Sequence, residues 1–210
     1  WDLIFKAISP LILISIGAGL TIPFVNLFFN SIFNFSSSDF SIMGSGTAVL
    51  VFFSSLMVPT LKHKYGYWMT IVFVQGLSIC CLITLAITEL FSTSNYAIYF
   101  AVSAFILRQP LMHMAHPSSN ELMMNYVGER NQELISALSS SLWSASWFIS
   151  AKIFEWLRLL KFHYYEIFLI TAVLYIIGVI LYAVIIRQFE KMKKMEKDNV
   201  ITLSEEIKID

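Results

Sequence analysis

The feature that most constrains this chain is a succession of long apolar runs separated by short polar segments. Six such runs cover residues 3–29, 41–59, 69–90, 96–117, 134–157 and 166–186. A bilayer core is about 30 Å thick, and a helix needs about 20 apolar residues to cross it. Barrel strands would instead alternate over about ten residues. The runs therefore predict an all-α membrane protein, with a six-helix transmembrane bundle at residues 1–186.

Composition excludes most soluble classes of protein. Of 210 residues, 57% are hydrophobic and only 13% are charged, whereas soluble domains carry about 25% charged residues. The formal net charge of +0 provides no basic field for nucleic acid. We expect a lipid bilayer to surround the chain, and no nucleic acid to bind it. Residues 187–210 differ in composition and form a charged tail.

The distribution of basic residues predicts the orientation of the bundle. Lys62 and Lys64 lie in the second loop, Arg130 lies in the fourth, and several lysines lie in the tail. The first and third loops contain no Lys or Arg, although the fifth departs from the pattern with Arg158 and Lys161. Because cytoplasmic loops are enriched in Lys and Arg, we predict that both termini are cytoplasmic.

The fourth run carries the most informative polar residues. Four of them recur at i, i+4, i+7 and i+11 and share one helical face: Gln109, His113, His116 and Asn120. Strongly polar groups at the bilayer centre cost a few kcal/mol on insertion scales, so this face should meet a water-filled cavity or another helix. Hydrogen bonding between packed helices is an equally open interpretation for Gln109 and Asn120.

Arg108 lies beside this stripe, near the middle of the run. Its guanidinium keeps its charge at any working pH. Three roles remain open: pairing with a carboxylate, binding an anionic substrate, or capping carbonyls freed by Pro110.

Two other runs show a distinctive face. In the first run it is a candidate cavity wall, formed by Ser15, Gly19, Ile22, Asn26 and Asn30. In the fifth run it is a stripe typical of tight helix packing, formed by Ser136, Ser140, Trp143, Trp147 and Ser150.

No catalytic constellation is present in the sequence. It contains neither a His-Glu-x-x-His zinc motif nor a Gly-x-Ser-x-Gly elbow, and it has no phosphate-binding glycine loop. His113 and His116 are three residues apart, but spacing indicates no third metal ligand. We therefore expect no enzymatic activity, no cofactor and no metal site. The two histidines titrate in a range that suits proton coupling.

Three stretches resemble the C-terminal half of a major facilitator superfamily transporter. The stretch Gly17-Ala18-Gly19-Leu20-Thr21-Ile22-Pro23-Phe24-Val25-Asn26-Leu27 is similar to the seventh helix of that family. Leu61, Lys64 and Gly66 match its loop motif Gly-x-Leu-x-Asp-Arg-x-Gly-Arg-Arg, where Pro59 and His63 replace the first Gly and the Asp, and Tyr67 and Trp68 replace the final basic pair. Residues 108–117, followed by 128–132 and the Ser-Trp-rich run, resemble the tenth helix, the next loop and the eleventh helix.

The resemblance implies a multi-pass carrier in a bacterial or archaeal cell membrane that works by alternating access. In this family the first and fourth helices of each half line the substrate cavity. The implied cavity residues are Asn26, Arg108, Gln109, His113, His116 and Asn120. The implied cytoplasmic loop or gate residues are Leu61, Lys64, Gly66, Glu129 and Arg130.

The expected function is secondary active transport of a small solute, with protons as the expected coupling ion. Because the family's cavity lies between two six-helix halves, the expected partner is an N-terminal half in the same native chain or in a second subunit. The alternative is a six-helix membrane domain with a structural or sensory role and no transport. The sequence does not identify the substrate, since its aromatic, Met-rich character suits a drug-like solute and Arg108 suits an anion.

Overall fold

The computed structural model describes the backbone of residues 2–206 and the side chains of residues 2–199, and the described backbone is helical apart from short links. The final residues of the charged tail, 207–210, lie outside the described part. The elements in chain order are α1 (Asp2–Thr21), η1 (Ile22–Phe24), α2 (Val25–Phe33), α3 (Ser37–Tyr67), η2 (Trp68–Phe73), α4 (Val74–Ile87), η3 (Thr88–Phe91), α5 (Ala97–Val127), η4 (Glu129–Asn131), α6 (Gln132–Leu159) and α7 (Tyr164–Glu206).

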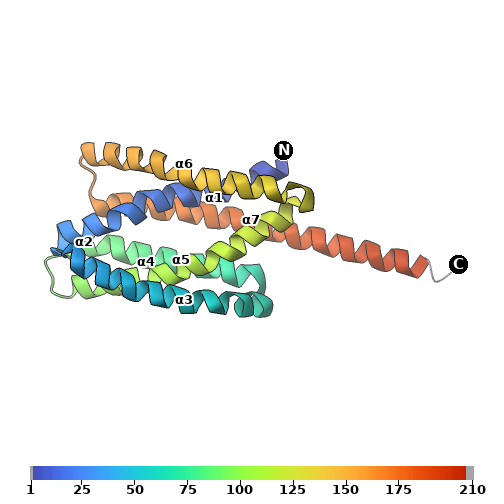
Figure 1. Cartoon of the computed structure of the whole chain (residues 1–210), viewed down its shortest axis with the longest axis horizontal. Coiled ribbons are helices and arrows are strands. Elements are labelled where there is room, and N and C mark those ends of the chain that lie inside the picture. The colour runs from blue at the N-terminus through green and yellow to red at the C-terminus, as the bar shows by residue number, and fades with distance from the viewer. Residues whose placement is uncertain (1, 207–210) are drawn as a thin grey trace.

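The prediction of six separate helices is wrong, because the described residues form five continuous helical stretches. The predicted second and third spans belong to one stretch, Ser37–Phe91. Within it Gly66 leaves the helical conformation, with φ 71° and ψ −168°. Figure 1 shows α3 running to one end of the bundle and α4 returning from it. A single glycine therefore reverses the chain where a loop was expected.

Among the described residues, three helical stretches are long and apolar enough to cross a membrane: Asp2–Phe33, Ser37–Phe91 and Tyr164–Asn199. α5 and α6, which correspond to the fourth and fifth predicted spans, are long enough but less apolar. The physical reason is their content of polar residues, with Arg108 and two histidines in α5 and many serines in α6.

The helices lie roughly along one direction, and their connections gather at two ends (Figure 1). One end holds the start of α1, the α3–α4 turn, the α5–α6 link and the outward part of α7. The opposite end holds the other three links. α7 continues well past the bundle, so the described part of the charged tail prolongs the last helix through Glu206.

Small residues bring α1 close to its neighbours. A Cβ on Gly19 would lie 2.6 Å from Ser150 Cβ on α6, and one on Gly17 would lie 2.8 Å from the ring of Tyr175 on α7. Across the α1–α6 contact, the Ser15 and Ser146 hydroxyls lie 2.8 Å apart. Close backbone approach through small residues is typical of helices that pack within a membrane. This contact involves Ser146 and Ser150 of α6, whereas Ser136 and Ser140 of the predicted stripe are exposed.

Candidate functional site: a cavity between α1 and α5

A cavity of about 250 Å³ lies between α1 and α5 and is completed by residues of η1, α4, α6 and α7. It is lined by Leu11, Ile14, Ala18, Ile22, Gln75, Gln109, Met112, His113, His116, Ser119, Asn120, Trp143 and Tyr182. The α1 wall is apolar, whereas most of the polar lining comes from α5. The lining contains no Asp or Glu.

Four predicted cavity residues, the whole α5 stripe, meet in this lining. Gln109, His113, His116 and Asn120 lie on one face because their spacing follows the helical repeat. The Asn120 amide nitrogen Nδ2 lies 3.2 Å from His116 Nδ1. The His116 ring meets Trp143 of α6 edge to face, with centroids 5.6 Å apart. Both histidines are exposed, so this side of the cavity is open within the described part of the chain.

Gln75, Tyr182 and Trp143 line the same cavity, although sequence reasoning did not place them there. Gln75 is only 5% exposed, and its Oε1 has no hydrogen-bond partner among the described residues. A buried polar atom without a partner carries a desolvation cost of about 1–3 kcal/mol. Gln75 is the most polar residue of the mainly apolar α4, and this is the signal that could have identified it.

Arg108 does not line the cavity, because its side chain is directed into the core behind Gln109. It is 1% exposed. Its Nη2 donates to the Tyr175 hydroxyl at 3.3 Å, and its Nη1 donates to Gln109 Oε1 at 3.4 Å. Arg108 Nε has no hydrogen-bond partner among the described residues. Arg108 therefore lies one side chain away from the cavity, in contact with α7.

Asn26 does not reach the lining either. It lies in α2 and is half-buried. The 3₁₀ turn of η1, which contains Pro23, separates it from the part of α1 that forms the cavity wall. Of the predicted face in the first run, only Ile22 lines the cavity.

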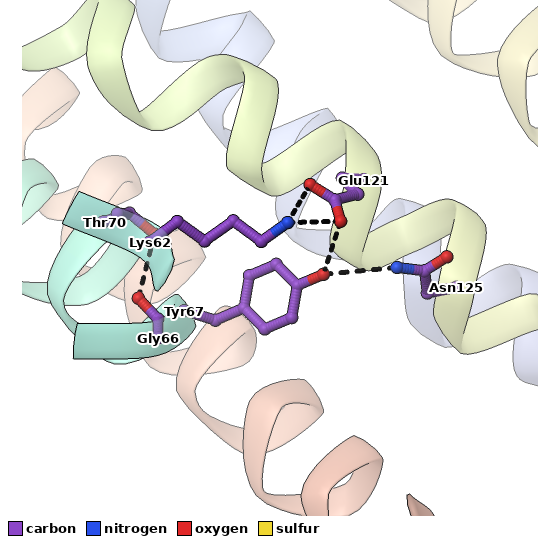
Figure 2. A network of polar contacts seen from close by, with 6 residues as sticks. All are labelled: Lys62, Gly66, Tyr67, Thr70, Glu121 and Asn125. Carbon is purple, nitrogen blue, oxygen red and sulfur yellow. Dashed lines mark hydrogen bonds and ion pairs between the residues drawn. The ribbon is translucent and has the colours of Figure 1, made fainter. Parts of the chain in front are cut away.

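A second polar site ties the α3–α4 turn to α5 (Figure 2). The Lys62 ammonium pairs with the Glu121 carboxylate, which also accepts a hydrogen bond from the Tyr67 hydroxyl at 3.2 Å. Asn125 Nδ2 donates to the same hydroxyl, also at 3.2 Å. Figure 2 shows Lys62 and Tyr67 reaching from the turn toward the two α5 residues. Sequence reasoning missed Glu121 and Asn125, because pairing between distant helices leaves no local pattern.

The predicted loop residues do not gather in this second site. Gly66 forms the turn itself, and Leu61 is half-buried. Lys64 is exposed, with its Nζ 5.1 Å from the centroid of the Tyr65 ring. Glu129 and Arg130 are exposed in η4, in the link between α5 and α6.

No protein-family model matches this chain, and no curated protein is significantly similar to it. Functional interpretation therefore depends on the residues and the geometry of the chain itself.

Proposed function

We propose that the chain is one half of a secondary transporter of the major facilitator type, which moves a small solute by alternating access. The observation that carries the proposal is the cavity between α1 and α5, with an apolar wall on one helix and the polar stripe on the other. α1 covers most of the first predicted span, and α5 covers nearly all of the fourth. Central sites between helices near the middle of the bilayer are typical of such carriers.

The distribution of charge supports a membrane-crossing bundle with both termini in the cytoplasm. In this proposal the five helical stretches cross the bilayer six times. The stretch Ser37–Phe91 crosses twice, because the chain reverses at Gly66. The α3–α4 turn, the α5–α6 link and the tail carry Lys and Arg and lie at the same end of the bundle (Figure 1). A shared basic end is what the positive-inside rule requires of the cytoplasmic side.

The proposed transporter is coupled to protons and includes a second six-helix half. His113 and His116 lie on the open side of the cavity, and an imidazole exchanges protons near physiological pH. In a membrane-spanning bundle, strongly polar side chains such as these histidines do not face lipid. A second six-helix unit therefore covers the open side of the cavity. That unit belongs to the same native chain or to another subunit.

The test is solute uptake by proteoliposomes that contain the native gene product, with and without an imposed pH gradient. A panel of anionic, neutral and cationic organic solutes is supplied. We expect flux that depends on the gradient and falls at least tenfold in His113→Ala, with Lys152→Ala as the control. Lys152 is exposed on α6, outside the cavity lining, and its ammonium pairs with Glu155 of the same helix.

Two other outcomes would contradict different parts of the proposal. Equal flux in His113→Ala and in the control would remove the proton-carrying role of the histidine. Folded protein that moves no member of the panel would overturn the transport proposal. The non-transporting membrane domain would then be the better interpretation.

A further inference from the structure

Arg108 is the only charged side chain that is buried among the described residues. None of the ion pairs within the described part of the chain includes it. Its partners are a phenol and an amide, and both are neutral. Moving a cation out of water is costly unless an opposite charge compensates it. The structure therefore contains a positive charge whose counter-charge does not come from the described residues.

Gln109 connects this charge to the cavity. Its Oε1 accepts the Arg108 Nη1 hydrogen bond, which leaves its amide NH₂ as the free donor. Since Gln109 also lines the cavity, a solute there meets a donor amide with a guanidinium directly behind it. Both features favour a negatively charged acceptor over a positively charged group.

The remaining lining fits the same chemistry. It has no carboxylate, so no described group in the cavity would compensate a bound cation. Leu11, Ile14 and Ala18 form an apolar wall on α1, and Trp143 adds an aromatic surface on α6. The volume of about 250 Å³ is slightly below the range of about 300–1,000 Å³ typical of drug-sized ligands. The space suits a compact solute that has one polar end.

We propose that the cavity binds a compact amphipathic organic anion, such as an aromatic monocarboxylate. The carboxylate lies toward Gln109 and the charge of Arg108, and the apolar body lies against the α1 wall and Trp143. This inference rests on the proposed function, because it names the class of solute that the proposed transporter binds. Arg108 acts through Gln109 and is a positioning residue.

The test uses three probes of one shape that differ in charge: benzoate, benzamide and benzamidinium. Their binding to the native gene product in lipid nanodiscs is measured by calorimetry. We expect benzoate to bind tightest and benzamidinium weakest. In Arg108→Gln the ratio of benzoate affinity to benzamide affinity should fall about tenfold, because the nearby positive charge is lost. Arg108→Lys should retain part of the preference, and Lys152→Gln should leave it unchanged.

The ratio of benzoate affinity to benzamide affinity distinguishes a lost charge from misfolding, since a misfolded variant loses binding of both ligands together. Gln109→Leu provides a second variant that keeps the buried arginine and removes the donor, and it should lower the ratio as well. Tighter binding of benzamidinium, no binding of benzoate, or an unchanged ratio in Arg108→Gln would overturn the anion proposal. Binding is measured without flux, so a transporter that prefers cations contradicts only this inference. A protein that binds benzoate but moves no solute contradicts only the transport proposal.

Discussion

The contact between α1 and α6 should be sensitive to a single methyl group at Gly19. In Gly19→Ala the new Cβ would lie 2.6 Å from both Cβ and Oγ of Ser150, and 3.3 Å from the Ser146 backbone oxygen. Ser150 is a short side chain that already donates to the Ile16 carbonyl at 2.8 Å. It has little room to retreat, so the two helices must move apart.

The change in the free energy of unfolding combines two destabilising contributions and one stabilising contribution. Overpacking costs about 1–3 kcal/mol. Loss of the Ser150 hydrogen bond costs about 1 kcal/mol. The helix propensity of Ala returns up to about 1 kcal/mol. We therefore expect the free energy of unfolding to fall by about 1–3 kcal/mol, which is roughly a five- to 150-fold change in the folding equilibrium.

The measurement is reversible unfolding in mixed detergent micelles, followed by far-ultraviolet circular dichroism. Gly76→Ala is the matched control, because a Cβ there meets no atom within 4 Å and Gly76 is also within a helix. Ser150→Gly removes both atoms that cause the clash, so it should make Gly19→Ala less harmful. If Gly19→Ala is as well tolerated as Gly76→Ala, the reasoning about close α1–α6 packing is refuted.

Two further predictions concern the α3–α4 turn. Gly66 has φ 71° and ψ −168°, a conformation that is essentially restricted to glycine, so Gly66→Ala should destabilise the fold by about 1–3 kcal/mol. The same unfolding assay tests this, with Gly46→Ala in open helical surroundings as its control, and equal stability of the two variants would contradict it. Glu121→Gln removes the carboxylate that pairs with Lys62. Because Glu121 is partly exposed and the pair is screened by solvent, the loss should be at most about 1 kcal/mol. Hydrogen exchange should increase at residues 62–70, and unchanged exchange there would show that the pair does not hold the turn.

Much of the helical layout can be predicted from the sequence, because long apolar runs and helical periodicity are local properties. The α5 stripe is the clearest case. Its spacing alone places Gln109, His113, His116 and Asn120 on one face, and the structure brings all four to one cavity. The reversal at Gly66 was expected as a loop, since sequence does not reveal that neighbouring residues remain helical on both sides of a single glycine.

Other features depend on which helix faces meet. Arg108 could be placed near the middle of its run, but its contact with Tyr175 depends on how α7 packs beside α5. The same is true of Gln75 and Tyr182 in the cavity, and of the pairing of Lys62 with Glu121 across distant helices. Asn26 is a further case, because the 3₁₀ turn at η1 separates it from the part of α1 that lines the cavity.

The sequence by itself determines that this chain is helical, where its long apolar runs lie, and which residues share a face within each helix. Only the tertiary structure decides that Gln109 lies between a buried guanidinium and an open cavity. The physical reason is that helical periodicity fixes the direction of a side chain around its own axis. The rotation and approach of neighbouring helices are set instead by contacts between residues far apart in the sequence, such as Gly19 with Ser150.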